Sequence, residues 1–213
     1  MGSEVQSRLY VVAAAGADPR QLAATLDAAG AATLLITAGD AGALSADATR
    51  PLVELAQSKE IAALIDGDAQ LARTLRADGV HLPWSKNPAA SYAEARDILG
   101  TRYIVGIDVG RSRDDAMTLA EDGADYIAFG IPPHVEDRAA AAARRLELVA
   151  WWGEIFEIPC VAFDVDTGDD AISLAGAGAD FVAVRADALQ DPAETRALAQ
   201  ATAEAAQKRE AMA

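Results

Sequence analysis

Short apolar runs alternate along the chain with longer segments in which apolar positions recur at helical spacing. Three junctions between them are nearly the same: a small residue and an Asp precede a short apolar run at 77–82, 123–130 and 178–185. A junction of this kind is typical of a helix that leads into a buried parallel strand. Its repetition within one chain predicts a (β/α) barrel.

Counting these units along the chain predicts eight strands and eight helices. The strands are expected at residues 9–12, 33–36, 62–66, 79–82, 103–107, 124–129, 159–163 and 179–184. The helices are expected to begin near Pro19, Ser45, Ala69, Ser91 (in a capping box with Glu94), Ser112, Arg138, Asp169 and Asp191. Eight units in order predict an α/β fold, a single (β/α)8 TIM barrel over residues 1–213, whereas a doubly wound sheet needs fewer units.

Composition limits the compartment and the partners. The 213 residues carry a formal net charge of −15. Such an acidic excess disfavours nucleic acid and anionic membrane surfaces as partners, because both would be repelled. The one cysteine, Cys160, excludes an internal disulfide framework, and no apolar stretch is long enough to span a membrane. We therefore expect a cytoplasmic protein of enzyme size without a membrane or nucleic-acid partner.

The loops that follow the carboxyl ends of the strands carry function in a (β/α)8 barrel. Asp66, Asp108 and Asp164 end or follow the third, fifth and seventh expected strands. Because alternate strands supply the side chains of one layer, these carboxylates are expected to converge at the barrel mouth. They suit a hard metal cation such as magnesium or calcium, or an amine-bearing ligand, and without one they would raise one another's pKa.

Four further side chains complete the candidate site at the mouth: His81, Lys86, His134 and Arg185. We expect Arg185 to pair with Asp164 and His134 to reach over the mouth from a Pro-bounded loop. His81 lies inside a strand end, so packing is the expected role. Structural alternatives stand beside the functional ones: an Asp just after a strand commonly caps the next helix, and Arg144 and Arg145 are expected to be solvated.

The framework of the chain resembles the thiamine phosphate synthase family and its thiazole tautomerase relatives. The likeness extends from Leu9 to about Pro192 and is carried by Leu9-Tyr10-Val11-Val12, Asp78-Gly79-Val80-His81-Leu82, Val105-Gly106-Ile107, Gly123-Ala124-Asp125-Tyr126-Ile127 and Gly178-Ala179-Asp180. The resemblance implies a (β/α)8 barrel and a transferase of thiamine biosynthesis. That family joins a pyrimidine diphosphate to a thiazole phosphate with magnesium.

The diphosphate and magnesium positions that the resemblance implies are changed in this chain. Residues 35–38 stand where the family has a Gln, an Arg and a nearby Lys that clamp the diphosphate. Asp66 and Gly67 stand where it has an Asn and a magnesium-binding Asp, and a second metal Asp falls at or near Lys86. Of the family's site residues, only Asp66, by type, and His81 are kept. The resemblance therefore predicts impaired diphosphate and magnesium binding.

The positions that would hold a phosphate are changed as well. Asp108 stands where the family has a phosphate-binding Ser, and Gly110 where the tautomerase has its catalytic His. Residues 164–165 and 185–186 replace a Gly pair and a Val-Ser that hold the thiazole phosphate. Two of these contacts are now carboxylates, which repel a phosphate. A degenerate active site with lost or altered parent activity is expected.

Three hypotheses of different classes remain. The first is a thiamine phosphate synthase-like barrel whose activity is lost or changed. The second is an enzyme of different chemistry that uses Asp66, Asp108 and Asp164, with or without a metal. The third is a non-catalytic barrel that binds a ligand or partner, with its Ala-rich helices as an oligomer face. We expect a homo-oligomer, a dimer, and a small-molecule ligand that is not a phosphate bound in the family manner.

Overall fold

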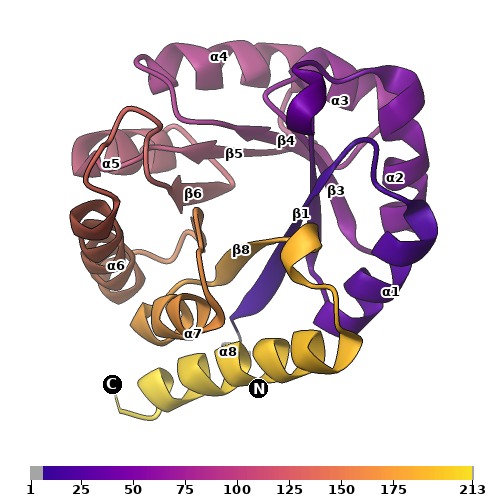
Figure 1. Cartoon of the computed structure of the whole chain (residues 1–213). Coiled ribbons are helices and arrows are strands. Elements are labelled where there is room, and N and C mark those ends of the chain that lie inside the picture. Colours follow the sequence, from indigo (N-terminus) through magenta and orange to yellow (C-terminus); the bar gives the residue numbers. More distant parts are fainter. Residues whose placement is uncertain (1–6, 213) are drawn as a thin grey trace.

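The computed structural model describes residues 7–212, and in this part eight parallel strands close into a barrel inside a ring of helices (Figure 1). The strands are β1 (Arg8–Ala14), β2 (Thr33–Thr37), β3 (Ala62–Asp66), β4 (Gly79–Leu82), β5 (Ile104–Asp108), β6 (Tyr126–Phe129), β7 (Cys160–Ala162) and β8 (Phe181–Arg185). Each strand pairs with the next, and β8 pairs with β1. The predicted (β/α)8 barrel is confirmed.

Eight α-helices of the described part follow the strands in turn. They are α1 (Pro19–Ala29), α2 (Ala46–Ser58), α3 (Ala69–Leu75), α4 (Pro88–Leu99), α5 (Arg113–Glu121), α6 (Arg138–Ile155), α7 (Gly168–Ala177) and α8 (Pro192–Glu210). Asp191 caps its helix as predicted, and Ser45 and Ser112, near which helices were expected to begin, cap theirs. The predicted capping box at Ser91 is wrong, because α4 begins three residues earlier, at Pro88, with Asn87 as its cap.

The Asp residue repeated at the three helix–strand junctions makes the same kind of hydrogen bond in each. Asp78, Asp125 and Asp180 each accept a hydrogen bond of 2.8 Å from a backbone N–H at the start of the preceding strand. These strands are β3, β5 and β7, respectively. The amino ends of strands otherwise leave such donors without a partner. The repeat therefore ties β4, β6 and β8 to the strands before them at the amino end of the barrel, opposite the mouth.

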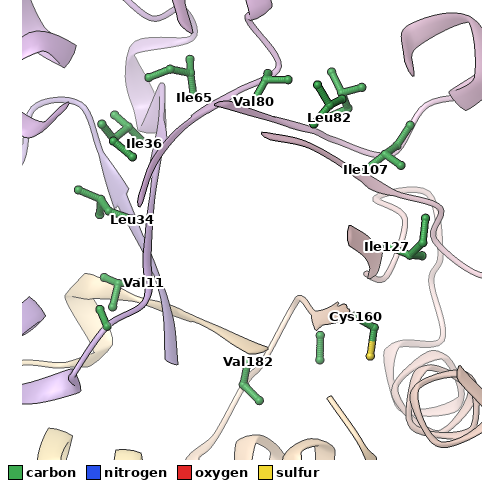
Figure 2. Packing of buried hydrophobic residues seen from close by; sticks show 14 of the residues in the cluster. Val11, Leu34, Ile36, Ile65, Val80, Leu82, Ile107, Ile127, Cys160 and Val182 are labelled. Atoms are coloured by element: carbon green, nitrogen blue, oxygen red, sulfur yellow. The ribbon is translucent and has the colours of Figure 1, made fainter. Parts of the chain in front are cut away.

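The strands bury both of their faces. Side chains that point outward, such as Val11, Ile36, Ile65 and Ile107, fill the layer between the strands and the helices (Figure 2). A smaller cluster points inward and fills the barrel below the mouth: Tyr10, Leu35, Leu64, Tyr126, Ala128, Val161 and Ala183. The inward cluster is the floor on which the candidate site rests. Within residues 7–212, no helix is both long and apolar enough to cross a membrane.

Candidate functional site at the barrel mouth

The carboxyl ends of the strands surround a cavity of about 280 Å³. His81 of β4 and Phe163, just after β7, line it with stacked rings whose centroids are 4.4 Å apart. Asp66, Asp108 and Asp164 line it as well. The structure thus brings four of the residues singled out from the sequence to one cavity, which we call the mouth cavity.

The three carboxylates of the mouth cavity are not helix caps. The N-cap residues of the helices that follow β3, β5 and β7 are Asp68, Ser112 and Thr167, and each accepts a backbone N–H. The capping alternative for Asp66, Asp108 and Asp164 is therefore wrong. All three residues line the mouth cavity instead.

Asp108 and Asp164 face one another across Gly130. A Cβ atom added to Gly130 would lie 2.4 Å from Oδ2 of Asp108 and 3.0 Å from Oδ2 of Asp164. Oδ1 of Asp108 accepts hydrogen bonds from the backbone N–H groups of Gly110 (2.7 Å) and Gly130 (3.1 Å). Burial, helped by the nearby charge of Asp164, raises the pKa of Asp108 to about 6 despite these two donors. Glycine at position 130 thus leaves room for two carboxylates to approach each other.

The floor of the mouth cavity is a neutral hydrogen-bonded chain. The hydroxyl of Tyr126 lies 2.9 Å from the hydroxyl of Tyr10 and 2.9 Å from Nδ1 of His81. Burial lowers the pKa of His81 to about 3, so its imidazole is uncharged at neutral pH. Burial also raises the pKa of Asp66, beside His81 in the register, to about 6. The expectation that His81 packs at a strand end agrees with its stacking on Phe163.

Trp84 and Pro132 cover the β5 side of the mouth cavity. Gly110 has a φ of +59°, and a Cβ added there would lie 2.7 Å from Cδ1 of Trp84 and 2.9 Å from Cγ of Pro132. The position where the resemblance places a tautomerase His therefore has no space for a side chain unless Trp84 and Pro132 move. His134 is exposed and touches the same Trp84, with ring centroids 4.9 Å apart, but it does not line the mouth cavity.

A second hollow of about 650 Å³ adjoins the mouth cavity on the side of β8, β1 and β2. The two share Val12, Thr37, Phe163 and Asp164. Arg185 lines this hollow, but it pairs with Asp187, two residues along, rather than with Asp164 as predicted. The carboxylate of Asp164 instead pairs with Arg138 of α6, whose Nη2 lies 3.7 Å from Oδ1. The short spacing lets Arg185 and Asp187 pair locally at the surface, which removes Arg185 from the carboxylates.

The residues present do not fit the magnesium that the resemblance implies. Within residues 7–212, no three metal-ligating side chains come together in a possible metal site. The predicted cation site formed jointly by Asp66, Asp108 and Asp164 is therefore not assembled. Lys86 is exposed and lies outside the mouth cavity, and Gly67 has no side chain to offer.

Sequence reasoning missed several residues that shape the mouth. Arg145 was expected to be solvated, but its side chain is only 1% exposed and contacts the loop after β7. Tyr10 and Tyr126 were placed in strands without any role for their hydroxyls. A signal existed for the two tyrosines, because a buried phenol needs a hydrogen-bond partner. None existed for Arg145, since its neighbour Arg144 is identical in type.

Comparisons with known proteins agree with the fold. The family model described as thiamine monophosphate synthase matches residues 9–188. The thiamine-phosphate synthase of Erythrobacter litoralis is 35% identical over 190 residues, covering 85% of this chain and 88% of that protein. That of Rhodospirillum centenum is 37% identical over 194 residues, covering 87% and 91%. A solved structure, the thiamine phosphate pyrophosphorylase from Pyrococcus furiosus, superposes with a TM-score of 0.74 at 21% identity, covering 95% of this chain and 98% of that one.

Proposed function

This chain belongs to the thiamine monophosphate synthase family, and we propose that it does not perform the phosphate-dependent coupling reaction associated with that family. Its mouth instead takes a small molecule that carries positive charge and no phosphate. The observation that carries the proposal is the pair Asp108 and Asp164, whose Oδ2 atoms face the same point above Gly130. Both stand where the resemblance places phosphate contacts.

Electrostatics favours a cation over an anion at this pair. Two like charges that face a common point repel by on the order of a few kcal/mol at an effective dielectric constant near 20. The raised pKa of Asp108, about 6, reflects burial first and the charge of Asp164 second. A bound cation relieves the repulsion and keeps Asp108 ionised, whereas a phosphate increases the repulsion. Binding of a cation is therefore expected to weaken below about pH 6.

The shape of the mouth cavity favours a small ligand with a flat apolar body. Trp84 and Phe163 present aromatic rings, Ile131 and Pro132 add apolar surface, and the volume is about 280 Å³. Aromatic faces also attract cations. A ligand with an amidine or amine attached to a ring can stack on the aromatic side chains and pair with the carboxylates at the same time. Benzamidine is a suitable probe, with benzamide as its neutral match and benzoate as its anionic match.

Isothermal titration calorimetry tests the proposal. Benzamidine is expected to bind, with benzamide and benzoate at least about tenfold weaker, which corresponds to about 1.4 kcal/mol. Asp164→Asn should weaken benzamidine binding, and Asp187→Asn, in the neighbouring hollow, should leave it unchanged. The pyrimidine diphosphate of the family reaction should show no binding with or without magnesium. Magnesium-dependent binding of that diphosphate, or turnover with the thiazole phosphate, would overturn the proposal.

A second candidate function, an acid–base enzyme of altered chemistry, is favoured by one further observation. Asp66 and Asp108 both line the mouth cavity with pKa values raised to about 6. A carboxyl group with a pKa near the working pH suits general acid–base catalysis. A panel of amines and amidines incubated with the protein separates this enzyme from a barrel that only binds. Conversion by the wild type and not by Asp108→Asn supports the enzyme; binding without conversion supports the binding barrel.

A further inference from the structure

Helix α6 carries two adjacent arginines with opposite surroundings. The side chain of Arg144 is 43% exposed and pairs with Glu147 on the same helix. The side chain of Arg145 is 1% exposed and points at the loop between β7 and α7. A buried guanidinium is costly unless several acceptors surround it. What surrounds Arg145 therefore indicates what it does.

One terminal nitrogen of Arg145 binds the backbone beside the mouth. Its Nη1 donates to the carbonyl oxygen of Phe163 at 2.6 Å and also to that of Asp164. Both residues line the mouth cavity and also the neighbouring hollow. Because both carbonyl groups bind the same nitrogen, the backbone direction is fixed at Asp164, and with it the direction of the Asp164 side chain.

The other terminal nitrogen ties this loop to the start of α7. Nη2 of Arg145 lies 2.8 Å and 2.7 Å from the two carboxylate oxygens of Asp170. Oδ2 of Asp170 in turn accepts the backbone N–H of Asp166 at 3.3 Å. The loop from Phe163 to Asp166 is thus wrapped around the Arg145–Asp170 ion pair.

Asp164 needs such a support. Its φ is +56°, in the left-handed region that residues other than glycine seldom adopt. In this conformation its carbonyl turns to Arg145, while its Oδ2 accepts the backbone N–H of Ile131 at 2.6 Å across the mouth. The same residue is therefore held on its backbone side by α6 and presents its carboxylate to the loop after β6.

We propose that Arg145 is a positioning residue that sets the place of the Asp164 carboxylate at the mouth through the backbone of the β7–α7 loop. Arg145 does not line either hollow, so it acts without touching a ligand. The inference concerns the site of the proposed function, but its geometric part stands without it. Loss of Arg145 is expected to have the consequences of loss of Asp164.

Nuclear magnetic resonance supplies two readouts that do not depend on a ligand. The first is hydrogen exchange of the Ile131 amide, which Asp164 protects. The second is the pKa of Asp108, which the charge of Asp164 raises. In Asp164→Asn the Ile131 amide should exchange about tenfold faster, as expected when a neutral amide oxygen replaces a charged acceptor, and the pKa of Asp108 should fall.

Arg145→Met should reproduce both changes, and Arg145→Met combined with Asp164→Asn should add nothing to either single variant. Arg144→Met is the matched control and should change neither readout. If Arg145→Met does not fold, Arg145→Lys answers the same question. It keeps a charge for Asp170 but cannot hold the two carbonyl oxygens and the carboxylate through separate nitrogens. Arg145→Lys should also speed up exchange of the Ile131 amide and lower the pKa of Asp108.

Three outcomes decide the matter. Faster exchange at Ile131 and a lowered pKa of Asp108 in the Arg145 variants, with no added effect in the double variant, support the positioning role. Unchanged readouts, or additive effects, would falsify it. Benzamidine titration of the same proteins should show at least fivefold weaker binding in Arg145→Lys, as in Asp164→Asn. If the wild type binds no benzamidine, the proposed function fails, while the two resonance readouts still decide the role of Arg145.

Discussion

On one side of the mouth, Asp108 is 9% exposed and lines the mouth cavity together with Pro132 and Trp84; on the other, the side chains of Arg185 and Asp187 are 73% and 60% exposed. We call these the closed half (Asp66, Trp84, Asp108 and Pro132) and the open half (Thr37, Asp40, Arg185 and Asp187). The carboxylates of the closed half have raised pKa values near 6, caused by burial. Asp187 in the open half has a lowered pKa, because Arg185 donates to it.

The comparison shows that the number of carboxylates at the barrel mouth does not determine which ligand they favour. In the open half, Arg185 and Asp187 are two residues apart, both face solvent, and their charges pair with each other. The closed half has no cation of its own among the residues that line the mouth cavity. Its carboxylates are therefore the groups whose energy a cationic ligand would change most. Asp164 stands between the halves, and Arg145 holds it there.

The largest effect is expected where the two carboxylates meet. Gly130→Ala places a Cβ 2.4 Å from Oδ2 of Asp108. The carboxylate can withdraw only by giving up its bonds to the backbone of Gly110 and Gly130. We expect a loss of about 1–3 kcal/mol, as for overpacking in a core. Each kcal/mol lowers the Tm of a chain of this size by about 2–4 °C, measured by thermal denaturation.

Gly16→Ala is the control for that substitution, because a Cβ at Gly16 meets no atom within 4 Å. Its Tm should stay close to that of the wild type. Equal Tm values for the Gly130 and Gly16 variants would show that the carboxylates do not converge at Gly130, and the closed half would then lose its defining feature.

The next effect is a gain of stability from removing a charge. The pKa of Asp108 is about 6 in the folded protein against an ordinary value of 3.8, so folding favours the protonated form. The stability penalty is absent below about pH 4, grows as the pH rises toward 6 and is complete above it. Asp108→Asn should therefore be more stable than the wild type by about 1–2 kcal/mol at pH 8 and equal to it near pH 4. Urea unfolding at the two pH values measures this difference, and a variant less stable than the wild type at pH 8 would contradict burial as the cause.

Much of the fold was predictable because its signals are local. The repeated Asp78, Asp125 and Asp180 mark the same junction three times, and each makes the same bond to a neighbouring strand. The rule that alternate strands share a layer predicted convergence of Asp66, Asp108 and Asp164, and Asp108 and Asp164 do face a common point. These features depend on spacing along the chain, which the sequence displays directly.

The rest of the site depends on contacts that spacing does not reveal. Arg144 and Arg145 are the same residue type on one helix, and only the packing of α6 against the β7–α7 loop makes one of them buried. The sequence also did not reveal which Asp caps α3, because Asp68 follows Asp66 by two residues and has the same side chain. The partner of Arg185 was decided by the loop after β8, whose conformation no pattern in the sequence fixes.

The smallest effect is expected in the open half, and its sign is opposite to that of Asp108→Asn. Asp187 has a lowered pKa because of its hydrogen bond from Arg185, so its contribution is present above its ordinary value of 3.8 and is lost as the pH falls through the folded value. Because the pair is exposed, Asp187→Asn should cost no more than about 0.5 kcal/mol at pH 8, and less in 1 M salt. Urea unfolding at low and high salt measures it. A cost as large as the gain from Asp108→Asn, unchanged by salt, would mean that the open half is as shielded from water as the closed half, and the difference between them would not be one of burial.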